Sequence, residues 1–242
     1  MSNLGVAKSS PDSAIGRSSN LSPAVEDYLR ALYKLGRRNP PDEPVTTSQV
    51  AACLAVRPAS ATAMLQKLAA LEPPLVVYHK SHGARLTAAG ERSALSIVRC
   101  HRLLELFLHE KLGYTWDEVH EEADRLEHAV SDEMAGRIAA ALGHPTRDPH
   151  GQAIPAADLS LEYVAAVPLH SLPPGAAAVV RQVRDDDPAM LRLFAALGLR
   201  PGAPLVLLGT APDGTLRLHV AGCDVELAAA AAEHLLVIID ES

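Results

Sequence analysis

The sequence predicts an α+β protein built from an N-terminal winged helix-turn-helix, an α-helical segment and a C-terminal small β-barrel. Helical periodicity that ends in a hairpin fills residues 21–90, and helical periodicity alone continues over residues 91–155. Short apolar runs between Pro and Gly turns fill residues 169–242. Residues 156–168 are expected to be a linker, and residues 1–20, rich in Ser, Gly and Asn, a disordered tail.

The first part has the element order of a winged helix-turn-helix. A helix is expected from Pro23, which suits a first helical turn, to Gly36. Two short helices are expected within residues 45–71, followed by strands at residues 75–78 and 84–86 that a polar tip connects. This order of helix, short helix, turn, helix and hairpin predicts a DNA-binding domain.

The middle part is expected to be helical over residues 88–112, 115–128 and 131–142, with an ordered loop over residues 144–155. Capping signals set the helix starts: Thr87 precedes the first helix, and Thr115-Trp116-Asp117-Glu118 has the pattern of a capping box. In the last part, apolar runs at 177–180, 205–208, 216–220 and 235–239 predict strands, and Pro188–Leu197 predicts one helix. The turn Pro212-Asp213-Gly214 indicates a hairpin.

Composition excludes several classes of protein. Aromatic residues are only 3% of 242, which argues against modules that stack nucleic-acid bases on aromatic side chains. The three cysteines lie far apart, so neither a disulfide framework nor a thiolate zinc site is expected. No run of 18 apolar residues and no signal peptide is found, so no membrane partner and a cytoplasmic location are expected.

Charge is distributed unevenly along the chain. The net charge is −7, yet residues 1–92 hold 11 Lys and Arg against 7 Asp and Glu, a net of +4. Residues 93–160 and 161–242 are acidic, with net charges of −6 and −5. A basic front third followed by an acidic remainder fits an anionic partner at one end and cations at the other.

Residues 119–128 hold the most informative cluster. At about 100° per residue, His120, Asp124, Glu127 and His128 fall on one helix face, within roughly 100° of arc. The preceding helix carries His101 and Glu105 at i and i+4, again on one face. Six side chains able to bind metal on two neighbouring helices predict a metal site. The simpler alternative is a solvated acidic face with incidental histidines.

Six motifs identify the family that the chain resembles. They are Val25-Glu26-Asp27-Tyr28-Leu29, Arg57-Pro58-Ala59-Ser60-Ala61-Thr62, Leu86-Thr87-Ala88-Ala89-Gly90, His101-Arg102-Leu103-Leu104-Glu105, His120 through His128 with Ser131-Asp132-Glu133, and Pro149-His150-Gly151. Together, over residues 22–242 and in the family's order, they resemble the diphtheria-toxin-repressor family of metal-dependent repressors, which has iron-type and manganese-type members. The resemblance implies that the C-terminal barrel is an SH3-like domain of the FeoA type.

The resemblance implies a primary metal site made of Asp27, Asp124, Glu127 and His128. Iron-type members carry Met and Cys at the first two of these positions. The two carboxylates present here are hard oxygen donors, which favour Mn²⁺ over softer ions. Mn²⁺ is therefore the expected cofactor, with Fe²⁺, Co²⁺ or Zn²⁺ as substitutes, and an Fe²⁺-responsive repressor of the same family is the alternative.

The resemblance also implies an ancillary site made of His101, Glu105, His120, Gln182 and Asp185. Iron-type members have Glu then Gln at the last two positions, so Asp186 and Asp187 are alternatives to that pair. Manganese-type members without the third domain have a Glu at the position of Arg30, so a binuclear site that shares such a Glu is not expected.

The expected function is that of a Mn²⁺-sensing repressor, not an enzyme, that controls genes of metal-ion homeostasis and transport. Its expected partners are double-stranded DNA with a palindromic operator and a second copy of the chain. The apolar positions Leu95, Val98, Leu103, Leu106 and Phe107 suggest that residues 93–142 carry the dimer contact. The candidate DNA contacts are Arg57, Pro58, Ser60, Thr62, Lys67, Lys80, His82 and Arg85.

Two other classes are weighed against a repressor. A metallohydrolase is disfavoured because the sequence has no HExxH motif and no evident general base beside an open metal position. A metal-binding adaptor that docks a protein through its SH3-like domain is disfavoured by the basic winged helix. A gel shift with and without Mn²⁺ distinguishes the three classes.

Overall fold

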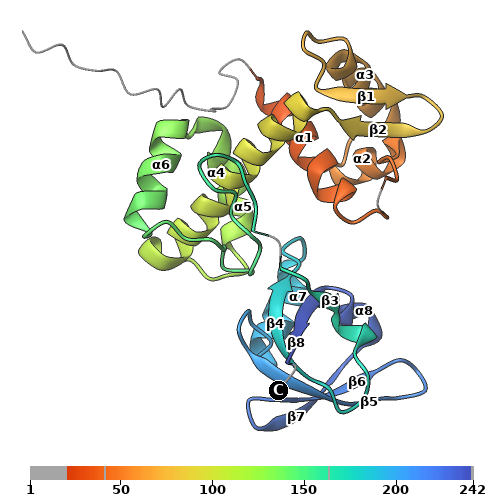
Figure 1. The fold of residues 1–242 in the computed structure, drawn as a ribbon, viewed down its shortest axis with the longest axis vertical. Helices are drawn as coiled ribbons and strands as arrows, with labels where there is room; N and C mark the ends of the chain where they lie inside the picture. Colours follow the sequence, from red (N-terminus) through yellow and green to blue (C-terminus); the bar gives the residue numbers. More distant parts are fainter. Residues whose placement is uncertain (1–20, 41, 163, 241–242) are drawn as a thin grey trace, which may run out of the picture.

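The computed structural model describes residues 21–40, 42–162 and 164–240, so the tail expected over residues 1–20 lies outside the described residues. The described chain forms three parts, each around its own hydrophobic core (Figure 1). The α+β architecture predicted from the sequence is confirmed. None of the helices in these ranges is both long and apolar enough to cross a membrane.

The first part is a winged helix-turn-helix. Its elements are α1 (Pro23–Gly36), α2 (Thr47–Cys53), α3 (Pro58–Ala69), β1 (Val76–His79) and β2 (Gly83–Leu86). Thr46 and Gln49 form a reciprocal capping box that starts α2. Leu29 of α1 packs with Leu65 and Leu68 of α3 in one core, and all three are fully buried. This core holds α3 and the β1–β2 wing in fixed positions relative to α1.

The second part is helical, with α4 (Ala88–Leu112), α5 (Val119–Leu126), the short 3₁₀ turn η1 (Glu127–Ala129) and α6 (Asp132–Ala141). Thr87 caps α4, and Gly113 ends it in the left-handed conformation with φ of 75°. Ile97 of α4 is buried in the first core, whereas Leu103 is buried in the second. One continuous helix therefore joins the DNA-binding part to the helical part.

The helix expected over residues 115–128 is shorter at both ends. The backbone N–H of Thr115 does donate to the Glu118 carboxylate at 3.1 Å, but α5 starts only at Val119. Trp116 lies in the intervening turn and is buried in the core of the third part. At the other end the chain tightens into η1, so Glu127 and His128 leave the α-helical register.

The apolar positions of α4 that were expected to contact a second protomer differ in burial, and Leu95 and Phe107 are only half-buried. Val98, Leu103 and Leu106 are buried inside the protomer's own cores and are not available to a partner. The large apolar side chains that the helical part exposes are Leu112, Tyr114, Leu126 and Met134. Periodicity identifies an apolar face correctly, but it does not show which neighbour covers that face.

The third part is a six-stranded antiparallel sheet in the order β3-β8-β4-β5-β6-β7. Its elements are β3 (Val167–Pro168), the 3₁₀ turn η2 (Leu169–Ser171), β4 (Ala177–Val183), α7 (Pro188–Ala196), β5 (Pro204–Thr210), β6 (Leu216–Val220), β7 (Cys223–Leu227), α8 (Ala229–Ala232) and β8 (Leu235–Ile239). The sequence analysis missed β7, an edge strand in which Asp224 and Glu226 interrupt the apolar residues and only Leu227 is buried.

The third part is joined to the helical part by specific contacts. Arg200 lies over the Trp116 ring, 5.1 Å from its centroid, and Arg192 pairs with Asp117 at 3.0 Å. The backbone N–H of Val183 donates to the His150 carbonyl at 2.9 Å. A Cβ at Gly151 would overlap a backbone carbonyl of β4, so only glycine allows this approach. These contacts bring the end of β4 to the polar cluster described next.

Candidate metal centre

Polar side chains from all three parts meet between α1, α4, α5–η1 and the segment after β4. Three groups of metal-competent atoms there each lie within 4.8 Å of one another: Asp27, Glu127 and His128; His101, Asp124 and Glu127; and His101, Glu105, His120 and Asp185. Glu127 and Glu105 are fully buried, although both are carboxylates. Buried carboxylates are stable only when paired with cations or hydrogen-bond donors.

The Asp27 group contains three of the four residues expected in the primary site. His128 Nε2 lies 3.2 Å from Asp27 Oδ1 and 3.8 Å from Glu127 Oε1. Burial raises the pKa of Asp27, an effect that His128 and Arg30 offset only in part. Two carboxylates and an imidazole around one point suit a divalent cation.

Glu26 orients His128 and was missed by the sequence analysis. Its carboxylate lies 2.7 Å from His128 Nδ1, and it is buried. With the Nδ1 proton held by Glu26, the Nε2 lone pair faces Asp27, as in the carboxylate–histidine pairs that support metal sites. The sequence gave no signal for this contact. Glu26 stands next to Asp27 in α1, whereas the histidine that it contacts lies 102 residues further along the chain.

Asp124 lies apart from Asp27 and His128 in this structure. Its carboxylate accepts a hydrogen bond from Arg30 at 2.5 Å and is 3.3 Å from His101 Nδ1. The same Arg30 nitrogen is 3.2 Å from Glu127 Oε2. Burial opposes the charge on Arg30, but Glu127 and Asp124 hold the pKa of Arg30 above its usual value. The positively charged guanidinium of Arg30 therefore lies between the carboxylates of Asp124 and Glu127.

The second expected site is largely assembled. His101 Nε2 is 3.0 Å from both Glu105 Oε1 and His120 Nδ1. Asp185 Oδ2 reaches within 3.4 Å of His120 Nδ1. Burial alone would lower the pKa of His101, but Glu105 and hydrogen bonds to Glu105 and Glu127 raise it to about 9. Before an ion binds, this histidine carries a proton that the ion must displace.

The remaining candidates are Gln182 of β4 and two aspartates of the loop that follows it. Gln182 lines a cavity together with Asp185, Arg102 and Gln152. Asp186 pairs with Arg38 and Arg184, and Asp187 caps α7 through the backbone N–H of residues 189 and 190. Of the acidic run, only Asp185 joins the cluster.

A further group, Glu105, Asp148 and His150, is fully buried and was not expected from the sequence. Glu105 Oε2, Asp148 Oδ2 and His150 Nδ1 each lack a hydrogen-bond partner among the described residues. Burial and the neighbouring Glu105 raise the pKa of Asp148 to about 7, against His150 and Arg102. Each of these three atoms can donate a lone pair to a metal ion, and they lie close enough together to bind one cation. The Pro149-His150-Gly151 motif was the available signal, but it had been given no role.

The candidate DNA contacts lie on α3, at its N-cap and on the wing. Arg57, Pro58, Ser60 and Lys67 are exposed on or beside α3, and Thr62 is half-buried there. Lys80 and His82 are exposed at the tip of the wing, and Arg85 lies on β2, 3.6 Å from Asp42. Arg57 and Lys67 are thus exposed on a helix that lies beside a basic hairpin, the order of elements with which winged helices meet a DNA groove and the DNA backbone.

Models of known families match all three parts. The N-terminal DNA-binding domain of iron-dependent repressors matches residues 20–84, their metal-binding and dimerisation domain matches residues 87–156, and the FeoA domain matches residues 167–239. The chain belongs to the iron-dependent repressor family. This membership places it among DNA-binding transcription regulators, not enzymes, and matches the resemblance to the diphtheria-toxin repressor seen in the sequence.

Relatives within the iron-dependent repressor family include both metal types. The iron-dependent repressor IdeR of Mycobacterium leprae is 34% identical over 149 residues, which are 57% of this chain and 64% of IdeR. The match therefore spans less than two thirds of the length of that relative.

Solved structures of family members match over nearly their whole length. A manganese-dependent transcriptional repressor in complex with manganese is 38% identical, with a TM-score of 0.81, covering 89% of this chain and 99% of that one. The repressor ScaR with bound Zn²⁺ is 33% identical, with a TM-score of 0.75 and coverage of 88% and 98%.

Proposed function

We propose that the protein is a Mn²⁺-responsive repressor that binds a palindromic operator as a homodimer and controls genes of metal-ion homeostasis. Family membership supports metal-dependent repression, DNA binding and dimerisation. The finer assignment to Mn²⁺ rests on the side chains at the cluster and on the similarity to a manganese-dependent repressor.

The observation that carries this proposal is the meeting of Asp27 with Glu127 and His128. Asp27 belongs to α1 of the DNA-binding part, whereas the other two lie in η1 of the helical part. Without a cation, Asp27 and Glu127 repel each other, and Asp27 holds a raised pKa. A divalent cation supplies the positive charge that joins these residues. The position of α1, and with it α3, then depends on the ion.

The donor set favours Mn²⁺ over softer ions. The Asp27 group offers carboxylate oxygens and one imidazole, and no sulfur atom belongs to any metal-competent group in the described chain. Cys100 is buried nearby, and its sulfur lies 3.9 Å from the Glu127 carbonyl oxygen. That sulfur belongs to none of the metal-competent groups. Hard oxygen donors suit Mn²⁺, although Fe²⁺, Co²⁺ and Zn²⁺ also bind such sites, often more tightly. The alternative is an Fe²⁺-responsive repressor, as IdeR is named.

A second ion is proposed beside Glu105. His101, His120 and Asp185 supply donors on one side of Glu105, and Asp148 and His150 supply donors on the other. Asp185 and the 148–150 loop lie at the contact between the third part and the helical part. An ion there fixes the barrel relative to α4.

The test is operator selection followed by a gel shift. DNA fragments are selected from a random library with the full chain in the presence of Mn²⁺, and the enriched sequence is assayed with and without Mn²⁺ and Fe²⁺. The expected result is a palindromic site that is bound only with metal, with Mn²⁺ effective. Binding of equal strength in excess chelator would overturn the proposal.

A further inference from the structure

Three cations in or just after α1 each pair with a carboxylate of another part of the molecule. Arg30 and Lys34 lie one helical turn apart on α1, and Arg38 follows shortly after its end. Arg30 pairs with carboxylates of the helical part, whereas Lys34 pairs with Asp185 at 3.3 Å and Arg38 with Asp186 at 3.1 Å. Asp185 and Asp186 follow β4 of the barrel. We call the contacts Lys34–Asp185 and Arg38–Asp186 the α1–barrel ion pairs.

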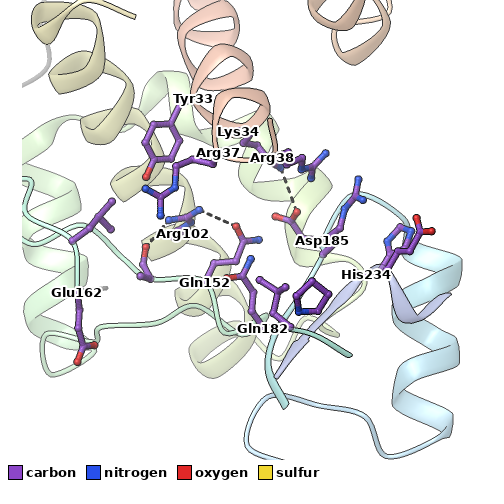
Figure 2. A pocket seen from close by; sticks show the side chains of 16 residues that line it. Tyr33, Lys34, Arg37, Arg38, Arg102, Gln152, Glu162, Gln182, Asp185 and His234 are labelled. Carbon is purple, nitrogen blue, oxygen red and sulfur yellow. Dashed lines mark hydrogen bonds and ion pairs between the residues drawn. The ribbon is translucent and has the colours of Figure 1, made fainter. Parts of the chain in front are cut away.

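The Lys34–Asp185 pair is the more buried of the two. The Lys34 side chain is 21% exposed and that of Asp185 only 3%, and Figure 2 shows Lys34 of α1 joined to Asp185 of the barrel. A carboxylate buried to this degree needs a positive partner. Asp185 Oδ1 faces Lys34, whereas Asp185 Oδ2 lies 3.4 Å from His120 Nδ1 of α5. One carboxylate of the barrel therefore contacts both the DNA-binding part and the helical part.

The Arg38–Asp186 pair lies closer to the surface. Its two side chains are 36% and 35% exposed, and Asp186 also accepts a hydrogen bond from Arg184 at 3.1 Å. An isolated exposed pair contributes little to stability. This pair stands next to Lys34–Asp185, however, so both pairs join the same two parts of the molecule. Asp186 belongs to no metal-competent group in the described ranges, so this contact can be changed without altering a candidate ligand.

Asp185 is also a candidate ligand of the second ion, in one group with His101, Glu105 and His120. Without metal, Lys34 supplies the positive charge that this buried carboxylate needs. With metal, the ion supplies it and repels the Lys34 ammonium, because like charges a few ångströms apart interact strongly at a partly buried site. Lys34 is therefore expected to pair with Asp185 in the metal-free protein and to lose that partner when the ion is bound.

We propose that the α1–barrel ion pairs hold the DNA-binding part against the barrel in the metal-free protein, and that Asp185 exchanges Lys34 for the second ion when metal binds. Asp185 then attaches the barrel to α4 and α5, and α1 is released from the barrel to be positioned through Asp27. The metal-free contact stands on the structure alone, whereas the exchange rests on the proposed function. Lys34 acts as a positioning residue for α1, and its effect is confined to the metal-free state.

The test is single-molecule fluorescence energy transfer between dyes on two native cysteines of the full chain. Cys53 at the end of α2 and Cys223 at the start of β7 are exposed, whereas Cys100 is buried. Dyes on the two exposed cysteines therefore report the distance between the DNA-binding part and the barrel. Labelled chain is diluted into unlabelled chain, so that a dimer carries one labelled protomer, and metal is removed with chelator. We expect a single narrow distribution of transfer efficiency for the wild type.

In chelator, Lys34→Gln should raise the population of undocked molecules by about tenfold or more, because a buried carboxylate loses its partner. Lys34→Arg keeps the charge and should behave as the wild type does. Arg137→Gln, which removes an ion pair within α6, is the matched control and should have no effect. Arg38→Glu and Asp186→Arg should each widen the distribution, and the chain that carries both changes, with the two charges exchanged, should recover the wild-type width.

In saturating Mn²⁺, with binding verified by calorimetry, the wild type and Lys34→Gln should give the same distribution, because Lys34 no longer pairs with Asp185. Circular dichroism verifies that each variant folds. The charge exchange between Arg38 and Asp186 gives an independent reading if Lys34→Gln does not fold.

Two results would overturn the proposal. Wild-type distributions in chelator for Lys34→Gln, Arg38→Glu and Asp186→Arg would mean that the α1–barrel ion pairs do not fix the DNA-binding part on the barrel. A difference between Lys34→Gln and the wild type that persists undiminished in Mn²⁺ would exclude the exchange at Asp185. Failure of the Mn²⁺ proposal is read separately, from operator binding that does not depend on metal, and it leaves the results in chelator unaffected.

Discussion

At the scale of single residues, the cluster depends on how each ligand is held as well as on which ligands are present. Glu26 fixes the ring of His128, and Arg30 occupies the space between Asp124 and Glu127. Both effects come from side chains that neighbour Asp27 on α1. The first turns of α1 therefore determine much of the chemistry of the candidate centre.

Glu26→Gln should weaken Mn²⁺ binding by about 10- to 100-fold, which is typical for loss of a partner that orients a metal-binding histidine. The amide can still accept or donate a hydrogen bond, but it no longer strengthens His128 as a ligand. Isothermal titration with Mn²⁺ measures this change. Glu133→Gln, at an exposed position of α6, is the matched control. Unchanged affinity in Glu26→Gln would mean that His128 does not bind the ion.

Arg30→Gln should make the metal-free protein less stable and raise its affinity for Mn²⁺. The guanidinium neutralises Asp124 and Glu127, one of which is fully buried, so its loss leaves charge uncompensated at a cost of about 3–5 kcal/mol. In the variant, an added Mn²⁺ ion binds near Asp124 and Glu127 without competition from the guanidinium. Urea denaturation with and without Mn²⁺ measures both effects. A variant that is destabilised equally in both conditions contradicts this role.

The metal-free protein should lose stability as pH rises from about 6.5 to 9. The pKa of His101 is raised to about 9 in the fold, so its stabilising charge is fully present below the unfolded value near 6.5 and is lost on passing 9. The pKa of Asp148, raised to about 7, acts in the same direction at lower pH. Urea midpoints against pH test this. Constant stability over that range in the metal-free protein is the opposing result.

At the scale of elements, caps and periodicity predicted most helices because these signals are local. Thr46, Thr87 and Ser131 each accept a hydrogen bond from the backbone three residues on. The contacts within the candidate metal centre were harder to predict from the sequence. Asp148 and His150 lie near Glu105 because Arg102 of α4 donates hydrogen bonds to Gln152 and Ala153 of the same loop, a contact that sequence periodicity does not encode.

Lys80→Gln at the wing tip should weaken operator binding for all sequences about equally and reduce the salt dependence by about one ion. Lys80 is exposed and lies at the end of a hairpin, where it meets phosphates and not base edges. Fluorescence anisotropy at several salt concentrations measures the slope. Lys111→Gln, at the exposed end of α4, is the control that should leave the slope unchanged.

At the scale of the whole molecule, the three parts are coupled through α4 and through Trp116. Trp116→Ala should destabilise the protein by about 3–5 kcal/mol, because the ring is buried in the barrel core although it belongs to the helical part. Trp116→Phe should cost less. Limited proteolysis of the segment 156–168 tests the same contact, and cleavage there should be faster in Trp116→Ala. Equal cleavage rates in the two variants would contradict docking through Trp116.

The central claim is that one ion joins Asp27 on the DNA-binding part to Glu127 and His128 on the helical part. Its most direct test is operator affinity against free Mn²⁺, measured by anaerobic fluorescence anisotropy for the wild type, Asp27→Asn and the control Asp224→Asn on the exposed strand β7. The account predicts that Asp27→Asn shifts the Mn²⁺ midpoint by about tenfold or more, at least about 1.4 kcal/mol, while the control does not move. A wild-type midpoint in Asp27→Asn would contradict it.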